Sequence, residues 1–185
     1  YDEKFRTRSP SEKDEIQEDL LDNTEIADAW EEYQKRTEVQ MRYFTDGPHY
    51  QLQTPTVAGR KDPNENNLAG LFLEQVSTIA GEGGYVAKVL PGVIFNGSFS
   101  KDLRMKMLNQ GSIDSLVTFE NKGIFDNIDD RYNFGIVTFK NEASTDVLKG
   151  IFQQTSIDIL DDLDQHAVEI PKRVLERYST ESRIF

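Results

Sequence analysis

The stretch that decides the fold lies between Glu120 and Phe139. It begins with Glu120-Asn121-Lys122-Gly123-Ile124-Phe125-Asp126 and ends with the apolar run Phe134-Gly135-Ile136-Val137-Thr138-Phe139. The first part is typical of a strand end and a loop that turns Phe125 outward, and the second is typical of a return strand. Because no helix is predicted between Ile113–Phe119 and Phe134–Phe139, we expect these two strands to be antiparallel.

Upstream of this pair, helical and extended patterns alternate. Apolar residues at spacings of three and four predict a helix from Leu68 to Ile79, ended by the glycines of residues 81–84. Tyr85–Leu90 is predicted to be a short buried strand, and a further helix is expected to reach about Leu108. The order helix–strand–helix–strand predicts an α/β fold, a doubly wound sheet with one antiparallel strand.

The flanking segments give weaker patterns. Residues 1–66 are expected to form an acidic helical segment, with helices near 11–21 and 24–44, and a long loop over 45–66 that is either functional or disordered. Trp30 lies on the apolar stripe of the second helix and is predicted to be a core anchor.

The last segment, residues 143–185, contains three separate helix candidates. Thr145–Gln153 has helical spacing, Ser156–Leu163 is acidic and continues it after a break, and Pro171–Tyr178 is a short helix candidate.

Composition excludes several kinds of site. The chain has 185 residues and no cysteine, so disulfides and thiolate metal sites are excluded, and with only His49 and His166 no histidine metal site is expected. The net charge of −12 argues against simple nucleic-acid binding, but residues 67–142 carry only 9 acidic and 7 basic side chains and leave room for a local DNA-facing surface. Because neither a membrane helix nor a signal peptide is evident, we expect a cytoplasmic protein.

A set of short motifs occurs in order along residues 1–142 and resembles the large adenine-N6 DNA methyltransferases, in particular type IIG restriction–modification enzymes and related phage-defence methylases. The motifs are Asn67-Leu68-Ala69-Gly70-Leu71-Phe72-Leu73-Glu74, Gly83-Gly84-Tyr85, Val89-Leu90-Pro91, Lys101-Asp102-Leu103-Arg104, Phe119-Glu120-Asn121 and Ile124-Phe125.

The resemblance implies the C-terminal half of a class I (Rossmann-like) methyltransferase sheet. Tyr85–Leu90, Leu116–Phe119 and Phe134–Phe139 would be its fifth, sixth and seventh strands. Residues 67–142 would be this α/β half, and 143–185 would lead toward a DNA-recognition domain. The family's glycine loop for S-adenosylmethionine and its Asn/Asp-Pro-Pro-aromatic catalytic motif are missing, since the chain contains no Pro-Pro pair. We therefore expect a fragment of an enzyme, without catalytic or cofactor-binding residues of its own, whose partners are DNA and the remainder of the same polypeptide.

One residue role carries over by position. In this family an aromatic residue between the last two strands stacks on the flipped target base, and Phe125 occupies that place. Lys122, Asn127, Arg131 and Tyr132 flank it and are candidate DNA contacts. The alternative for Phe125 is a hydrophobic plug that closes the loop on the sheet, and the alternative for its neighbours is that they are ordinary exposed loop residues.

Two other functions stay open. The acidic helices suit a non-catalytic protein-interaction module that binds a basic partner, and the α/β part also suits half of an RNA or protein methyltransferase. The sequence upstream of Tyr1 would separate these possibilities.

Overall fold

The computed structural model describes residues 4–64, 67–179 and 184–185. The chain divides into two compact units, Tyr1–Arg42 and Tyr43–Phe185. Helix α2 (Thr24–Asp46) crosses the boundary between them.

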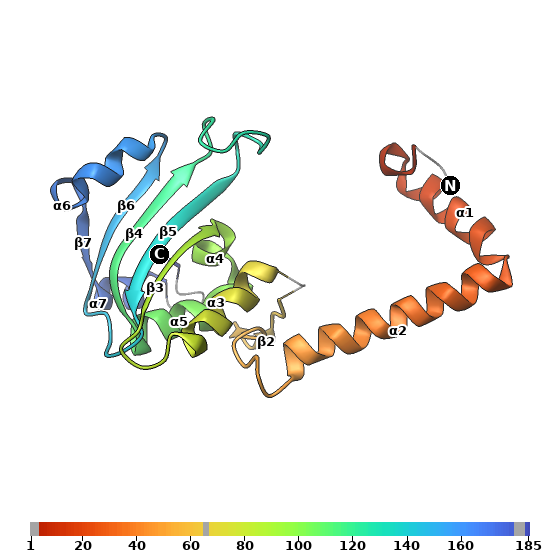
Figure 1. The fold of residues 1–185 in the computed structure, drawn as a ribbon, viewed down its shortest axis with the longest axis horizontal. Coiled ribbons are helices and arrows are strands. Elements are labelled where there is room, and N and C mark those ends of the chain that lie inside the picture. Colours follow the sequence, from red (N-terminus) through yellow and green to blue (C-terminus); the bar gives the residue numbers. More distant parts are fainter. Residues whose placement is uncertain (1–3, 65–66, 180–183) are drawn as a thin grey trace. The chain divides into compact units, whose positions relative to one another are not determined.

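The first unit consists of short and long helices (Figure 1). A 3-10 turn (Phe5–Thr7) precedes α1 (Pro10–Leu21), and α2 follows. Helix α1 begins at a capping box, in which the Ser9 hydroxyl accepts from the backbone N–H of Glu12 and the Glu12 carboxylate accepts from that of Ser9. Both predicted helices are confirmed.

The prediction that Trp30 anchors a core is wrong. Its side chain is 39% exposed and stacks on Tyr33, with ring centroids 5.5 Å apart. Neither α1 nor α2 contains a buried residue. The apolar stripe exists, but burial requires a second surface, and the described residues of this unit do not provide one.

The second unit is an α/β domain. Its helices are α3 (Leu68–Ile79), α4 (Val93–Asn96), α5 (Lys101–Gln110), α6 (Leu163–His166) and α7 (Lys172–Tyr178). Its main strands are β3 (Tyr85–Pro91), β4 (Ser112–Glu120), β5 (Asn133–Lys140), β6 (Val147–Gln154) and β7 (Val168–Pro171). Short 3-10 helices occupy Ser98–Ser100 and Ile157–Asp162.

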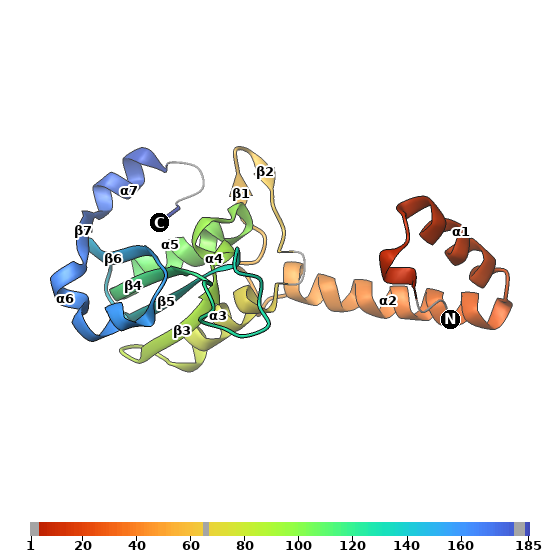
Figure 2. The ribbon, with the colours of Figure 1, turned by 90° about the horizontal axis from the view of Figure 1, so that it is seen from above.

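These five strands form one mixed sheet in the order β3-β5-β4-β6-β7 (Figures 1 and 2). Strand β5 lies between β3 and β4 and is antiparallel to both, so β3 and β4 run in the same direction. The predicted antiparallel pairing is confirmed. Since β6 is parallel to β4, the carboxyl ends of β3, β4 and β6 share one edge of the sheet.

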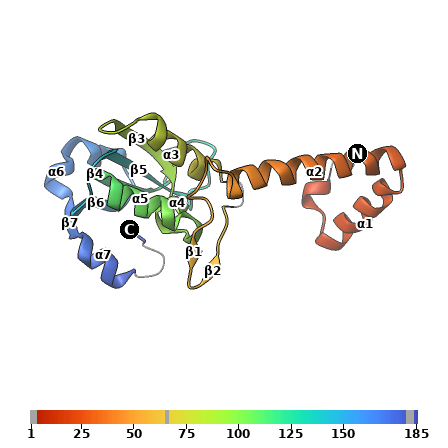
Figure 3. The same ribbon diagram turned by 90° about the horizontal axis from the view of Figure 1, so that it is seen from below.

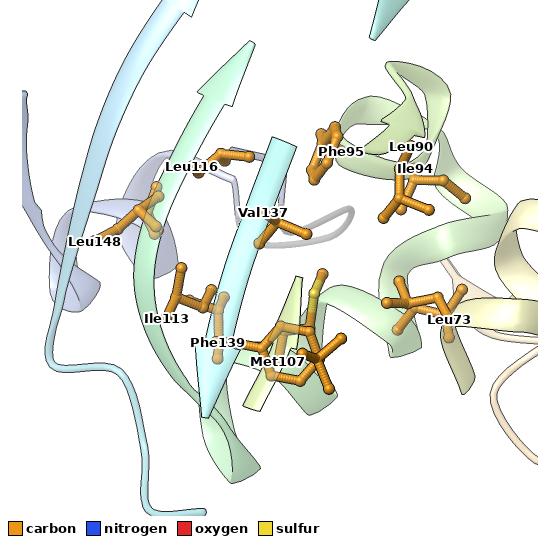
Figure 4. Packing of buried hydrophobic residues seen from close by; sticks show 14 residues of the cluster. Leu73, Leu90, Ile94, Phe95, Met107, Ile113, Leu116, Val137, Phe139 and Leu148 are labelled. Atoms are coloured by element: carbon orange, nitrogen blue, oxygen red, sulfur yellow. The ribbon is translucent and has the colours of Figure 1, made fainter. Parts of the chain in front are cut away.

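One face of the sheet carries the main hydrophobic core (Figure 4). Leu73 of α3, Ile94 and Phe95 of α4 and Met107 of α5 pack on the inward side chains of the strands, among them Val137. Gly135 allows this close packing, because a Cβ there would lie 2.5 Å from the Phe95 ring.

The opposite face is only partly covered. A second cluster joins Val117, Phe119, Phe134 and Ile151 with apolar side chains of residues 157–167. On β3, by contrast, the side chains that alternate with the core residues are exposed, with Tyr85 at 71% and Val89 at 55%. Apolar surface on an edge strand is a usual place for another element to pair or pack.

In the last part of the chain, one segment differs from the expectation. Thr145–Gln153 was predicted to be helical, and most of it is strand β6 instead. Leu148, Ile151 and Phe152 have helical spacing, but Leu148 and Ile151 enter the cores on opposite faces of the sheet. The helix predicted at Pro171–Tyr178 is confirmed as α7.

The long segment after α2 is ordered by polar contacts. It includes a hairpin of β1 (Thr56–Val57) and β2 (Arg60–Lys61), which projects from the rest of the unit (Figure 3). Gln53 and Asn64 are buried beside α3 and hydrogen-bond to each other at 2.5 Å. The described part of this segment is therefore ordered, and the alternative prediction of a disordered loop is wrong for it.

Candidate functional site

The loop between β4 and β5 lies at the sheet edge where β3, β4 and β6 end. In α/β proteins this carboxyl edge is where ligands usually bind. The register places Pro91 and Phe119 on either side of Phe134, the second residue of β5. Phe134 thus forms the base on which the loop of residues 121–132 rests.

Phe125 is brought to this edge by contact with Phe134. The two rings meet edge to face, with centroids 4.9 Å apart, and Phe134 stacks in turn on Phe119 at 5.0 Å. Even so, Phe125 remains 41% exposed. One part of the ring packs on the sheet, as a plug would, and another part is open to a second planar group.

Asn121, which was quoted only as part of a motif, organises the loop. Its side chain is fully buried, donates to the carbonyls of Phe125 (3.2 Å) and Ile128 (2.9 Å), and accepts from the N–H of Phe125 at 2.8 Å. Its own N–H donates to the carbonyl of Tyr132, which closes the base of the loop. A polar residue directly after a strand was the only signal in the sequence.

The candidate DNA contacts all lie in this loop, and the two cations are paired with neighbouring carboxylates. The Nζ of Lys122 lies 3.7 Å from Oε2 of Glu120. Arg131 makes a bidentate pair with Asp129, with Nε to Oδ1 at 2.9 Å and Nη2 to Oδ2 at 2.7 Å. Both pairs are exposed, so exchange of either carboxylate for a phosphate would cost little.

The remaining two candidates have different surroundings. Asn127 is exposed and adopts a left-handed backbone (φ 64°), a conformation that asparagine tolerates well. Tyr132 is 50% exposed and lines, with Arg131, a cavity of about 220 Å³ whose other wall is Pro91–Val93, Asn96 and Asn133. The structure thus brings Arg131 and Tyr132 beside the turn that leads from β3 into α4.

Buried Arg104 ties this turn to the core. Its Nη1 donates to the carbonyl of Ile94 in α4 at 2.7 Å. Burial lowers the pKa of Arg104 to about 10, so the side chain is still charged at neutral pH. A charged hydrogen bond from α5 therefore helps to fix the far wall of the cavity.

The Asp129–Arg131 ion pair is expected to depend on pH in a defined range. Hydrogen bonds from the side chain and then the backbone of Arg131 lower the pKa of Asp129 to about 2. Since the folded pKa is depressed, the pair is fully formed above the ordinary carboxyl range and is lost only as the pH falls through about 2. NMR titration of Arg131→Gln is expected to return the midpoint toward 3.8.

The control for this titration is Lys122→Gln. Lys122 is the weakest of the causes that act on Asp129, so the midpoint in this variant is expected to stay near 2. An unchanged midpoint in Arg131→Gln would show that the bidentate pair does not form in solution.

The described residues do not fit a binding loop for S-adenosylmethionine. The glycine that follows a strand into a helix is Gly92, between β3 and α4, and its backbone N–H donates to the carbonyl of Asn133 at 2.7 Å. A Cβ at Gly92 would lie 2.9 Å from the Cβ of Asn133, so close packing on β5 explains the glycine.

Among the residues with a described placement, no cluster of three potential metal ligands occurs. None of the described helices is both long and apolar enough to span a bilayer.

The sequence matches no protein-family model and no curated protein at a significant level. Solved structures do resemble the fold. The type IIG restriction endonuclease BpuSI superposes with a TM-score of 0.53 and 14% identity, over 77% of this chain and 18% of that chain. A chain from a structure of the type I R-M system gives a TM-score of 0.52 and 12% identity, over 70% and 34% of the two chains.

The chain therefore spans about a third of one of these proteins and less than a fifth of the other. The likeness concerns the fold alone. The second unit has the α/β fold of the C-terminal half of a Rossmann-like methyltransferase sheet.

Proposed function

We propose that this chain is part of an S-adenosylmethionine-dependent adenine-N6 DNA methyltransferase of a restriction–modification system, and that it forms one wall of the target-base pocket. The observation that carries the proposal is the half-exposed ring of Phe125, held on Phe134 at the carboxyl edge of a methyltransferase-like sheet. Two solved structures with a similar fold belong to a type IIG restriction endonuclease and a type I R-M system.

The proposed role of Phe125 is to stack on the flipped adenine. A base that leaves the duplex loses its stacking partners, and an aromatic side chain restores about 1–3 kcal/mol per base. The ring is already packed on one side and needs no rearrangement to offer its exposed part. Stacking of this kind holds the base in place while other residues act on its amino group.

The proposed role of Lys122, Asn127, Arg131 and Tyr132 is to contact the DNA around the flipped nucleotide. The loop of residues 120–132 contains the acids Glu120, Asp126, Asp129 and Asp130 and only two cations. Such a loop suits a few positioned contacts better than a broad phosphate-binding surface.

Cofactor binding and amino-group activation are assigned to the remainder of the same polypeptide. Two exposed apolar surfaces support the proposal that the remainder of the polypeptide packs against this unit. One is the open face of β3 at Tyr85 and Val89, and the other is the outer stripe of α3, where Leu68, Phe72 and Ile79 are all more than half exposed. Helix α3 is thus apolar on both its buried and its outer side, as expected of a helix packed between two layers.

The first test is a methyl-transfer assay with radiolabelled S-adenosylmethionine. The 185-residue chain alone is expected to be inactive, because it lacks the Asn/Asp-Pro-Pro motif. The gene is expected to encode that motif within a few dozen codons upstream of Tyr1, and the longer polypeptide is expected to produce N6-methyladenine in duplex DNA. Methyl transfer by the chain alone would contradict the prediction that the isolated chain is inactive, and with it the assignment of catalysis to the remainder of the polypeptide.

A second candidate function rests on the first unit. Its helices are acidic, yet Ile26, Trp30 and Tyr33 are exposed at 39–55%. An acidic helix with exposed aromatic side chains suits the capture of a basic, partly apolar partner. In that case the polypeptide that contains this chain would not transfer methyl groups to DNA.

A further inference from the structure

Both the nitrogen and the oxygen of the buried Asn121 amide are hydrogen-bonded to the backbone of the loop. The amide nitrogen donates to the carbonyls of Phe125 and Ile128, and the amide oxygen accepts from the N–H of Phe125. These partners fix the orientation of the amide group, because its NH₂ must face the two carbonyls. Phe125 is thereby bound through both its N–H and its C=O to one side chain.

This arrangement leaves only the ring of Phe125 free to interact with other molecules. The residues around it, Lys122, Gly123, Asp126 and Asn127, are all exposed, and Lys122 is held through Glu120. Ile124 packs on the partly covered face of the sheet and anchors the loop from one side only. The loop tip is therefore ordered mainly by a single buried amide.

We propose that Asn121 is the positioning residue for Phe125, and that it sets the height and angle at which the ring stands on Phe134. What the ring then meets rests on the proposed function, but the positioning itself does not. The role needs both a donor and an acceptor at this distance from the backbone. Aspartate would keep the acceptor but turn a carboxylate toward two carbonyl oxygens, and alanine would leave those backbone groups without their partner.

The test is amide hydrogen exchange in the complete 185-residue chain, measured by NMR. Asn121→Ala is expected to speed exchange at Phe125 about tenfold or more, because a hydrogen-bonded amide becomes free. Exchange at Val137 and Phe139 in the centre of the sheet is expected to stay unchanged. The matched control is Asn109→Ala, which removes an exposed side-chain amide from α5. It should change the exchange rate neither at Phe125 nor at Val137 and Phe139.

Asn121→Asp provides a second, independent signature. Burial beside two carbonyl oxygens raises the pKa of a carboxyl group. As the pH falls, the introduced group becomes protonated and donates a hydrogen bond again. At neutral pH the carboxylate repels the two carbonyl oxygens and is expected to open the loop, so that Phe125 exchanges faster than in the unaltered chain. The ratio of the two exchange rates at the same pH is therefore expected to fall toward one in acid. This variant also serves if Asn121→Ala does not fold.

The proposal is overturned if exchange at Phe125 is unchanged in Asn121→Ala, or if loop and sheet amides accelerate together, since the residue would then act on global stability alone. A pH-independent ratio in Asn121→Asp would also overturn it. The measurement needs no DNA, so a failure of the methyltransferase proposal leaves this result intact, and the reverse also holds.

Discussion

Phe125→Ala is expected to lower the rate of adenine methylation by the longer polypeptide about 5- to 150-fold. The estimate is the stacking free energy of one base on an aromatic ring, about 1–3 kcal/mol, converted at 1.4 kcal/mol for each factor of ten. The measurement is methyl transfer to duplex DNA, combined with the fluorescence of 2-aminopurine at the target position. With less stacking on the protein, the flipped state is expected to be less populated.

The matched control is Ile128→Ala. Ile128 is in the same loop and is 44% exposed, close to the 41% of Phe125, but it has no aromatic ring. Its loss is expected to change methylation less than twofold, as for an ordinary surface substitution. Phe125→Tyr keeps a planar face and is expected to retain most of the activity.

The same variant separates the two roles considered for Phe125. If the ring were only a plug on Phe134, Phe125→Ala would remove an edge-to-face contact of about 0.5–1.5 kcal/mol and leave the flipped base unaffected. Unfolding by urea would then show the whole effect. Unchanged methylation and 2-aminopurine fluorescence in Phe125→Ala would reject the stacking role.

The sequence predicted the centre of the second unit well, because local signals there agree with one another. The helix from Leu68 to Ile79 has one clear apolar period, and β5 follows β4 after a segment without helical pattern. A connection without a helix favours antiparallel pairing, and this pairing is found. Its position between β3 and β4 depends on tertiary contacts and was not predicted.

The errors occurred where one pattern fits two environments. Leu148, Ile151 and Phe152 suit a helical face and also a strand buried on both sides, and only pairing with β4 decides between them. Trp30 lies on a true helical stripe, but a stripe does not show whether another element covers it.

The role of Asn121 could not be predicted for a related reason. A polar residue after a strand is usually exposed, and its burial results from the way residues 125–129 fold back over it. The candidate site was therefore located by the sequence at Phe125, while the residue that holds the loop became evident only from its hydrogen bonds.

Glu74 has a comparable role on the other side of the unit. Its carboxylate is buried in α3 and accepts from the backbone N–H of Gln51 (2.7 Å) and Leu52 (3.1 Å) and from Nε2 of Gln53 at 2.6 Å. The long segment before α3 is attached to the domain through this group and through Asn64. Hydrogen bonds to a charged acceptor contribute about 1.5–3 kcal/mol each, which is more than neutral ones contribute.

Glu74→Ala is therefore expected to lower the free energy of unfolding of the second unit by about 2–4 kcal/mol. The loss is smaller than the sum of the three bonds, because the segment can detach locally and let water satisfy the freed N–H groups. Detachment loosens the β1–β2 hairpin, in which Arg60 and Lys61 are already exposed, so limited trypsin digestion is expected to cleave there faster. Urea unfolding followed by circular dichroism gives the free energy, and the digestion shows where the structure opens.

Gln75→Ala is the matched control, since it shortens the next side chain of α3 at an exposed position and is expected to change stability by less than about 0.5 kcal/mol. Glu74→Gln should fall between the two, because an amide keeps one acceptor but turns its NH₂ toward other donors. If Glu74→Ala unfolds like Gln75→Ala and resists trypsin equally, the carboxylate does not hold the segment, and apolar contacts such as that of Leu52 with the core must do so. A buried carboxylate that collects three donors is difficult to replace, because no uncharged side chain of that length offers three acceptor positions without a donor of its own.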